Sequence, residues 1–549
     1  MVRSEWSRPI DSIFAHHLLL HSTNHRWYGR LVGIQVDPRG VRLAELVAAL
    51  SLGIDLGFGQ PMEHVLRQCL IALRLAEHVG LGDEERATVY YTSLLVNVGC
   101  HTDAHEQAKW FGDDITLRST KFDYEPGSFA EAAAMVRMIG AGASPWDRLR
   151  TGLELATTGR TALASMLVMH ARLAGDFAKT LGLSDDVGEA LAGSYEQWNG
   201  RGSPGKFAGA AIPYASRIAL VAEYVEVAHR TAGVEVALEL AERRSGKMFD
   251  PDLVACLRVN ARDILGDIDG LETWTAVIDS EPALTVRLDA TQFETALTAI
   301  ADFVDLKSPY TLGHARAVSE LATAAGRQAG LTDDEVAMLR RAGLVAGLGR
   351  LGVSNAIWDK AGALTVGERE RVRMHPYFTG RMLQQSEALA PLGRVAVAYR
   401  ERLDGSGYPR GLPGNAIPFP ARILGASDAY QAMREPRPYR KALDAEHAAA
   451  ELRTDVRGGR LDRDAVDAVL AAAGHRAPRR REGPAGLTAR EVEVLTLIAH
   501  GLSNKQIAAR LVISPKTAGN RIEHIYTKIG AGNRASAGLF AMQHGLLPA

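Results

Sequence analysis

The chain has 549 residues, which is too long for one hydrophobic core and predicts about three or four domains. Hydrophobic residues make up 46% and charged residues 23%, so the composition excludes a globally disordered protein. The net charge of −1 hides an asymmetry, because residues 476–549 carry 11 Lys or Arg against 4 Asp or Glu and the rest of the chain is acidic. A basic end suggests a polyanionic partner.

Cysteine usage and hydropathy point to a cytoplasmic protein without membrane contact. Cys69, Cys100 and Cys256 are odd in number and show no paired spacing, which argues against a disulfide framework. No apolar run is long enough to cross a bilayer. Residues 1–40 contain "FAHHLLLH", whose histidines interrupt any signal-like core, so we interpret this segment as an N-terminal extension.

Residues 41–275 and 285–474 are predicted to be two copies of one helical domain. The spacing from His64 to Gly99 is 35 residues, and the spacing from His314 to Gly349 is also 35. The distance from Gly202 to Pro213 and from Gly407 to Pro418 is 11 residues in both copies. Such internal repetition indicates a duplicated structural unit. The first copy carries extra sequence between its two blocks.

A linker rich in Gly, Pro and Arg follows at residues 475–486, and residues 487–549 predict a small four-helix domain. Thr488 and Glu491 form a capping box that starts a first helix, and Gly501 ends it. Ser503 can cap a second helix, and Ser514 with Pro515 starts a third.

The third helix of this domain has two distinct faces. Its apolar residues recur at spacings of 4, 3 and 4 and predict a buried stripe made of Ala518, Ile522, Ile525 and Ile529. The opposite face is expected to enter a DNA major groove, where Asn520 can pair with adenine, Glu523 can accept from cytosine, and Gly519 allows close approach. The full set of predicted DNA-binding residues is Lys505, Ser514, Lys516, Thr517, Gly519, Asn520, Arg521, Glu523, His524 and Lys528.

Residues 487–547 resemble the LuxR-type C-terminal DNA-binding domain of bacterial regulators. The motifs that carry the resemblance are "LTAREVEVL", "GLSNKQIAARL", "ISPKT" and "IYTKIG". Ala518 and Arg521 depart from the residues usual in that family, Val and His, which leaves the operator preference open. The resemblance implies binding of double-stranded DNA as a homodimer, with the last helix, from Arg534 to His544, as the dimer face.

Both repeated copies resemble the HD-GYP branch of the HD phosphohydrolase superfamily. In the second copy the matching motifs are "SPYTLGHARAV", "MHPYFTGRML", "DGSGYPRGL" and "IPFPARI". The resemblance implies an all-α fold, so the whole chain is expected to form two HD-type helical bundles and a helix-turn-helix domain. Active members of this branch cleave cyclic di-GMP at a site of two or three metal ions.

The residues that would hold those metals are largely replaced. The family's His-Asp motif aligns with Ala346 and Gly347 in the second copy and with Val96 and Asn97 in the first. Its adjacent histidine pair aligns with Tyr399 and Arg400 in the second copy and with Ser194 and Tyr195 in the first. An arginine cannot lose its proton to become a ligand. Of the second-copy ligand set only His314, His375 and Asp428 remain, so no cofactor is predicted, although three ligands could in principle hold a single divalent ion.

Another candidate metal cluster lies in "CHTDAHE", where His101 and His105 are four residues apart, with Cys100, Asp103 and Glu106 nearby. The alternative, which we favour, is a polar helix start on the protein surface.

These observations favour a transcriptional regulator with a sensory or dimerising body that does not hydrolyse, controlled by a small molecule or a cyclic dinucleotide. Two alternatives stay open. The first is a metal-dependent phosphohydrolase, similar to a cyclic dinucleotide phosphodiesterase, with a rebuilt site. The second is a nucleotide-binding sensor that does not cleave its ligand and holds phosphate through Arg350, Arg400 or Arg440.

Overall fold

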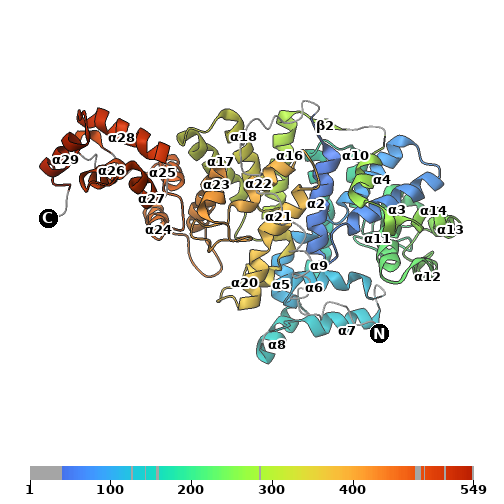
Figure 1. Ribbon diagram of the computed structural model, residues 1–549. Coiled ribbons are helices and arrows are strands. Elements are labelled where there is room, and N and C mark those ends of the chain that lie inside the picture. Colours follow the sequence, from blue (N-terminus) through green and yellow to red (C-terminus); the bar gives the residue numbers. More distant parts are fainter. Residues whose placement is uncertain are drawn as a thin grey trace. The chain divides into compact units, whose positions relative to one another are not determined.

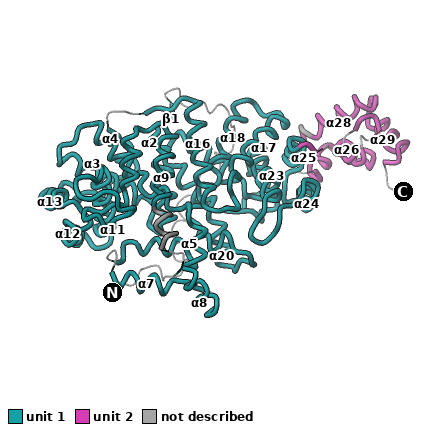
Figure 2. The backbone as a smooth tube through the Cα atoms, turned by 180° about the vertical axis from the view of Figure 1, so that it is seen from behind, with its two compact units in different colours: residues 1–473 teal, residues 474–549 magenta. Residues whose placement is uncertain are grey.

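The computed structural model describes residues 40–124, 128–142, 144–155, 157, 160–282, 286–475, 484–487, 489–511 and 515–546. These residues are almost entirely helical, which confirms the predicted all-α class. The chain forms two compact units, residues 1–473 and 474–549 (Figure 2). Both repeated copies lie in the first unit, so the boundary between them stays a prediction. The predicted N-terminal extension, apart from Gly40, and residues 476–483 of the linker lie outside the described residues.

The first module opens with a short strand and continues as a helical bundle. Its elements are β1 (Val41–Arg42), α2 (Leu43–Gly57), α3 (His64–His78), α4 (Asp83–Leu95), η2 (Val98–His101), α5 (Ala104–Phe111), α6 (Asp114–Ser119), η3 (Thr120–Phe122), α7 (Phe129–Met138), α8 (Pro145–Glu154), α9 (Arg160–Thr180), α10 (Asp185–Ala192), η5 (Gly209–Ala211), α11 (Tyr214–Ala232), α12 (Val234–Arg244), α13 (Pro251–Val259), α14 (Ala261–Leu265), η6 (Ile268–Gly270) and α15 (Thr273–Asp279).

The second module repeats this order in a shorter form. Its elements are β2 (Arg287–Leu288), α16 (Ala290–Asp305), α17 (His314–Gln328), α18 (Asp333–Val345), η7 (Leu348–Gly352), α19 (Asn355–Trp358), α20 (Val366–Arg373), α21 (His375–Leu383), α22 (Ala390–Ala398), η8 (Gly414–Ala416), α23 (Phe419–Arg434), α24 (Ala445–Arg457) and α25 (Arg463–Ala472). The strands β1 and β2 pair antiparallel, with Val41 opposite Leu288.

Local sequence sets several of the helix starts. The Asp289 carboxylate accepts hydrogen bonds from the backbone N–H groups of Thr291 and Gln292, both at 2.8 Å, at the start of α16. Thr332 and Glu335 form a capping box at the start of α18. Such caps satisfy backbone donors that the first helical turn leaves without a partner.

The two modules repeat each other in their contacts as well as in their helix order. Asp55 accepts a hydrogen bond from the backbone of Val65 at 3.1 Å, and Asp305 accepts one from Ala315 at 2.7 Å, which is the same contact 250 residues later. Glu63 and Gly313, at equivalent positions before α3 and α17, both have left-handed backbone angles. The structure therefore supports the predicted duplication.

In each module a glycine packs closely against the backbone of a histidine, and this contact identifies another pair of equivalent positions. A Cβ atom added to Gly99 would lie 2.5 Å from the carbonyl oxygen of His170, and one added to Gly349 would lie 1.8 Å from that of His375. Gly99 and His170 are 71 residues apart along the chain, whereas Gly349 and His375 are 26 apart. The first module therefore has 45 additional residues between its glycine and its histidine. His170 is thus the counterpart of His375.

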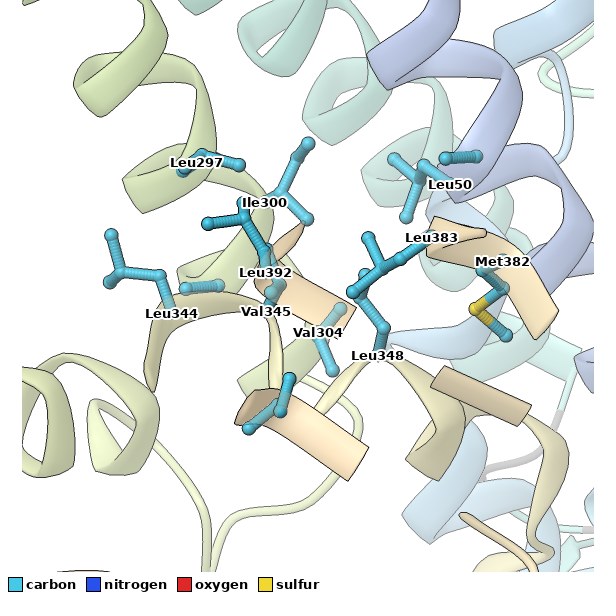
Figure 3. Close-up of a cluster of buried hydrophobic side chains, with 14 of the residues drawn as sticks. Leu50, Leu297, Ile300, Val304, Leu344, Val345, Leu348, Met382, Leu383 and Leu392 are labelled. Atoms are coloured by element: carbon cyan, nitrogen blue, oxygen red, sulfur yellow. The ribbon is translucent and has the colours of Figure 1, made fainter. Parts of the chain in front are cut away.

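The modules share one hydrophobic core. The first module's α2 packs against α3 and also against η7 and α21 of the second module (Figure 1). Figure 3 shows Leu50 of α2 near Met382 and Leu383 of α21, next to Val304 and Leu348 of the second module. All of these side chains are buried. Close packing across the module boundary makes the body one compact unit.

A buried polar cluster accompanies this apolar contact. The carboxylate of Asp114 accepts hydrogen bonds from the Ser354 hydroxyl and the Asn355 backbone, both at 2.7 Å, and lies 3.3 Å from the Lys307 ammonium group. Asp114 is fully buried. Because a buried carboxylate is costly unless it is paired, this cluster specifies how the inserted residues dock on the second module.

The C-terminal unit contains η9 (Pro484–Gly486), α26 (Ala489–Ala499), α27 (Asn504–Leu511), α28 (Pro515–Ile529) and α29 (Arg534–Gln543). As predicted, Ala518, Ile522 and Ile525 of α28 are buried, and Ile529 packs against them. Ser503 caps α27, and Gly501 follows α26 with a positive φ of 81°. Thr488, the predicted first cap, lies outside the described residues.

The Gly349–His375 approach gives a stability prediction. Replacing Gly349→Ala forces its Cβ against a backbone oxygen that cannot move freely, so we expect the free energy of unfolding to fall by about 3 kcal/mol, the upper end of typical overpacking costs. Urea denaturation of the full chain measures the loss. Gly367→Ala is the control, because no atom lies within 4 Å of its added Cβ. Equal stability of the two variants would contradict the proposed backbone contact.

Candidate functional site

The second-module site lies where α17, η7, α21 and α23 meet. His314 and His375 are the first residues of α17 and α21, and Asp428 lies within α23. All three side chains are buried, and the fold brings them into one region, as the sequence predicts. Each of these side chains forms hydrogen bonds or ion pairs with other protein groups.

Both imidazole nitrogens of His375 have protein partners. Nδ1 lies 2.6 Å from the Val372 carbonyl oxygen, and Nε2 lies 2.8 Å from the Tyr399 hydroxyl. Burial, followed by the positive charges of Arg400 and Arg350, holds the pKa of His375 well below its usual value. The imidazole is therefore neutral, with Nδ1–H donating to the carbonyl and Nε2 accepting from Tyr399.

The Asp428 carboxylate is paired with a guanidinium group. Nη2 of Arg400 lies 3.0 Å from one carboxylate oxygen and 3.2 Å from the other. His314 Nε2 lies 3.3 Å from the same carboxylate, while its Nδ1 lies 2.8 Å from Glu435. Burial alone would raise the pKa of Asp428, but Arg400, His314 and Arg350 lower it well below its usual range. The carboxylate is thus charged and already neutralised.

Arg350 adds a second internal cation. Its side chain is 8% exposed and lies 3.7 Å from both Asp305 and Asp428, with the guanidinium group over the Trp358 ring. The cavity left among these groups is only about 10 Å³, about the space of one water molecule.

None of the three arginines predicted to hold phosphate is free to do so. Arg350 and Arg400 face Asp428, and Arg440 donates to backbone carbonyl oxygens, including that of Met433 at 3.1 Å. Their contacts correct that expectation, because each guanidinium group stabilises the fold.

The glycine-rich loop after Arg400 is organised by a buried carboxylate that the sequence analysis missed. Glu401 accepts hydrogen bonds from the backbone N–H groups of Arg410 and Leu412 at 2.8 and 2.9 Å. In the first module Glu196 accepts from Lys206 at 2.7 Å and from Gly205 at 3.1 Å. The repeated contact shows that in each module a buried carboxylate holds the loop through the loop's backbone N–H groups.

In the first module a lysine takes the place of the arginines. Glu223, the counterpart of Asp428, lies 2.7 Å from the Lys121 ammonium group and accepts a hydrogen bond from Asn97 at 2.7 Å. Lys121 comes from η3, within the additional residues of this module. Burial would lower the pKa of Lys121, but Glu223 raises it, so the ammonium group stays charged. His64, the counterpart of His314, pairs with Glu226 at 2.5 Å.

His170 was also missed by sequence reasoning. Its Nε2 contacts the Asp103 carboxylate. Burial alone would lower the pKa of His170, but Cys100 and Asp103 raise it, to about 9. Cys100, on the facing turn, lies 3.0 Å from the Tyr195 hydroxyl. The 45 additional residues hide the equivalence of His170 and His375, which only the backbone approach at Gly99 reveals.

The interpretation of His101 and His105 as a polar surface cluster is wrong, because they lie at the contact between the modules. His101 is 5% exposed; its ring nitrogens lie near the carbonyl oxygens of Val98 and, at 2.6 Å, Phe303. His105 pairs with Asp359 at 2.8 Å. The two histidines are not on one helix, since His101 ends η2 and His105 belongs to α5.

The first module also contains the larger cavity. A volume of about 390 Å³ is lined by residues from η3, α7, α11 and the loop after α10. At the position of Tyr399 the first module has Ser194, whose small side chain leaves space that the tyrosine fills in the second. The two equivalent sites therefore differ, one being open and one closed.

In the C-terminal unit the predicted groove-facing residues lie on one exposed side of α28. Asn520, Glu523, His524 and Lys528 are exposed, Gly519 and Arg521 are half-buried, and Lys505 is exposed on α27. Lys528 pairs with Glu491 at 2.8 Å. Ser514 lies outside the described residues, as do the side chains of Lys516 and Thr517.

Among the residues that the structure describes, no group of three or more His, Cys, Asp or Glu side chains gathers in a geometry that could hold a metal ion. No helix in the same part of the chain is long and apolar enough to span a membrane.

Comparison with known proteins places these sites in a family. The HD domain model matches residues 125–253 and 298–465, and the model of bacterial regulatory proteins of the luxR family matches residues 485–541. The 3'3'-cGAMP-specific phosphodiesterase 3 of Vibrio cholerae is 32% identical over 412 residues, which cover 74% of this chain and 90% of that protein. The 3'3'-cGAMP-specific phosphodiesterase 1 of the same organism is 30% identical over 43% of this chain and 56% of its own length.

A solved structure extends the similarity to the fold. The crystal structure of a cyclic GMP-AMP-specific phosphodiesterase of Vibrio cholerae matches with a TM-score of 0.56 and 28% identity, over 80% of this chain and 99% of that one. The chain therefore belongs to the HD domain family and carries a C-terminal domain of the luxR family of bacterial regulatory proteins.

Proposed function

We propose that this protein is a DNA-binding transcriptional regulator whose HD-type modules sense a ligand and do not hydrolyse one. The observation that carries the proposal is that the ligand atoms a metal ion would need are already hydrogen-bonded or ion-paired to other protein groups. Tyr399 engages Nε2 of His375, and Arg400 engages the Asp428 carboxylate.

The metal pair that active HD-GYP members hold does not fit these residues. Metal-bridging hydrolysis needs a carboxylate between the two ions, and the aligned positions are Gly347 and Asn97. A divalent ion next to Asp428 would also have to displace a guanidinium group that is hydrogen-bonded and largely buried. A single ion held by His314, His375 and Asp428 would likewise have to displace Arg400 from Asp428.

The C-terminal unit supplies the DNA-binding half of the proposal. Asn520 and Glu523 are exposed on α28, a position from which side chains can read base edges, and Lys505 can contact phosphate. On α29, Leu539 is 50% and Met542 is 61% exposed, three residues apart on one side of the helix. This apolar strip supports dimerisation through α29 and recognition of a site with two-fold symmetry.

Regulation in this scheme is a population shift in a cytoplasmic dimer. A ligand that binds one arrangement of the body more tightly than another changes how often the two DNA-binding domains are correctly spaced. The curated relatives act on cyclic dinucleotides. A nucleotide is therefore the effector class that we expect.

The second candidate is a phosphohydrolase with a rebuilt site. The 32% identity to a phosphodiesterase over most of the body favours it. The contacts of Tyr399 and Arg400 favour the regulator.

Removing the internal cation should destabilise the body. Arg400→Met leaves the buried Asp428 carboxylate without its nearest guanidinium partner, so we expect the free energy of unfolding to fall by about 3 kcal/mol in urea denaturation at pH 7. Arg410→Met, on an exposed side chain of the same loop, should change it by less than about 0.5 kcal/mol.

The same pair makes a pH prediction. Because the pKa of Asp428 is lowered in the folded state, its contribution is complete above about pH 4, the usual carboxyl pKa, and is lost as the pH falls further. The stability difference between wild type and Asp428→Asn should therefore shrink below that pH. A difference that stays constant down to pH 2.5, or an Arg400→Met variant as stable as wild type, would contradict the buried ion pair.

Hydrolysis should be absent. Full-length protein incubated with 3'3'-cGAMP or cyclic di-GMP and Mn²⁺ should release no linear dinucleotide above the protein-free background, as measured by chromatography. Because the substrates include that of the similar phosphodiesterase, the assay tests the second candidate directly. Metal-dependent turnover that Asp428→Asn abolishes would establish the phosphohydrolase instead.

DNA binding should require the C-terminal unit. The full chain should bind DNA from its own promoter region with an affinity that falls as salt rises, and a chain ending at Ala473 should not bind. Asn520→Ala should lower the preference for the specific site by about 1–3 kcal/mol, whereas Lys505→Ala should weaken binding to all sequences alike. Electrophoretic mobility shift assays measure both. Binding that survives removal of the unit would refute its assigned role.

A further inference from the structure

The cavity of the first module has the features of a ligand site that the second module lacks. Its volume is about 390 Å³, against about 10 Å³ at the equivalent place in the second module. Ligand sites in proteins commonly measure about 300–1,000 Å³. Two differences in sequence open the cavity: Ser194 replaces Tyr399, and the 45 additional residues bring new wall residues from η3 and α7.

An ion pair formed by Lys121 and Glu223 lines the cavity. Lys121 and Asn97 both donate to the same carboxylate oxygen, Oε1 of Glu223. Among the described residues both donors to this carboxylate go to Oε1, so Oε2 faces the cavity without a protein donor, and the Glu223 side chain lines that cavity. A carboxylate oxygen that faces a cavity without a protein donor can accept a hydrogen bond from a ligand N–H group.

The walls and the rim supply the rest of the recognition surface. Tyr124 and Tyr195 line the cavity and supply aromatic surface for a planar ligand, whereas the Tyr224 ring already has the Arg244 guanidinium group 4.5 Å from its centroid. Arg201 stands at the rim with an exposed side chain that makes no ion pair or side-chain hydrogen bond with the described residues. A free guanidinium group is a good partner for a phosphate, which it can bind through two hydrogen bonds.

We propose that the first module binds a guanine nucleotide with one phosphate group, with the base at Lys121 and Glu223 and the phosphate at Arg201. The guanine edge presents an acceptor, O6, beside N–H donors, which matches an ammonium group beside a free carboxylate oxygen. Tyr124 and Tyr195 contact the base. The cavity volume of about 390 Å³ lies near the lower end of the range for ligand sites and suits one nucleotide. A cyclic dinucleotide, with two bases and two phosphates, is about twice that size.

This inference deepens the proposed function, since it names the ligand class of the sensing body. Binding and DNA recognition can nevertheless be measured separately. Lack of GMP binding in a protein that still binds DNA through its C-terminal unit would overturn only the ligand assignment.

Isothermal titration calorimetry of the full chain tests the proposal with GMP, AMP, guanosine and cyclic di-GMP as probes. We expect saturable binding of GMP, with AMP at least tenfold weaker because adenine reverses the order of donor and acceptor. Guanosine should also bind about tenfold more weakly, since it lacks the group that Arg201 holds. Failure of GMP to bind, or tighter binding of AMP or cyclic di-GMP than of GMP, would overturn the assignment.

Arg201→Ala provides the residue-level test, because an exposed rim side chain can be removed without disturbing the fold. The variant should weaken GMP binding about tenfold and leave guanosine binding unchanged. Arg258→Ala is the matched control, as Arg258 is 65% exposed and does not line the cavity, and it should bind GMP as wild type does. Equal GMP affinities in Arg201→Ala and wild type would refute the phosphate position.

Discussion

One electrostatic constraint shapes the site in both modules: a buried carboxylate must be neutralised by a cation. In the second module Asp428 is buried and takes its countercharge from Arg400, with Arg350 close by. In the first module Glu223 is buried and takes its countercharge from Lys121. A buried charge is stable only when it is paired and hydrogen-bonded, so each of these carboxylates needs the protein cation beside it.

The cation that neutralises the carboxylate comes from a different part of the chain in each module, and the space left at the two sites differs accordingly. The second module uses an arginine from the same loop that holds its glycine-rich turn, and Tyr399 fills the remaining space. The first module uses a lysine from additional residues, has a serine in place of the tyrosine, and keeps an open cavity. The duplicated fold therefore has a nearly filled site in the second module and an open cavity in the first.

Much of this architecture could be predicted from the sequence. The equal spacings from His64 to Gly99 and from His314 to Gly349 predicted the duplication, because helix lengths and turns are set by local sequence. The stripe of Ala518, Ile522 and Ile525 predicted the buried side of α28. Tyr399 and Arg400, at the positions of the family's histidine pair, predicted an incomplete ligand set, and this stays a prediction.

What the sequence did not reveal depends on contacts between distant residues. Lys121 is 102 residues from Glu223, and nothing in its neighbourhood marks it as a countercharge. His170 is separated from Gly99 by the additional residues, which removes the spacing that would identify it. His101 and His105 looked like a local cluster, yet their partners, Phe303 and Asp359, belong to the other module. Tertiary pairing of this kind cannot be inferred from spacing along one helix.

Metal analysis of the purified full-length protein tests the central claim most directly. After incubation with excess Mn²⁺ and removal of free ions by gel filtration, the account predicts far less than one metal ion per chain, because Arg400 and Lys121 already supply the positive charge. A stoichiometric metal ion that is lost in Asp428→Asn or in Glu223→Gln would contradict it.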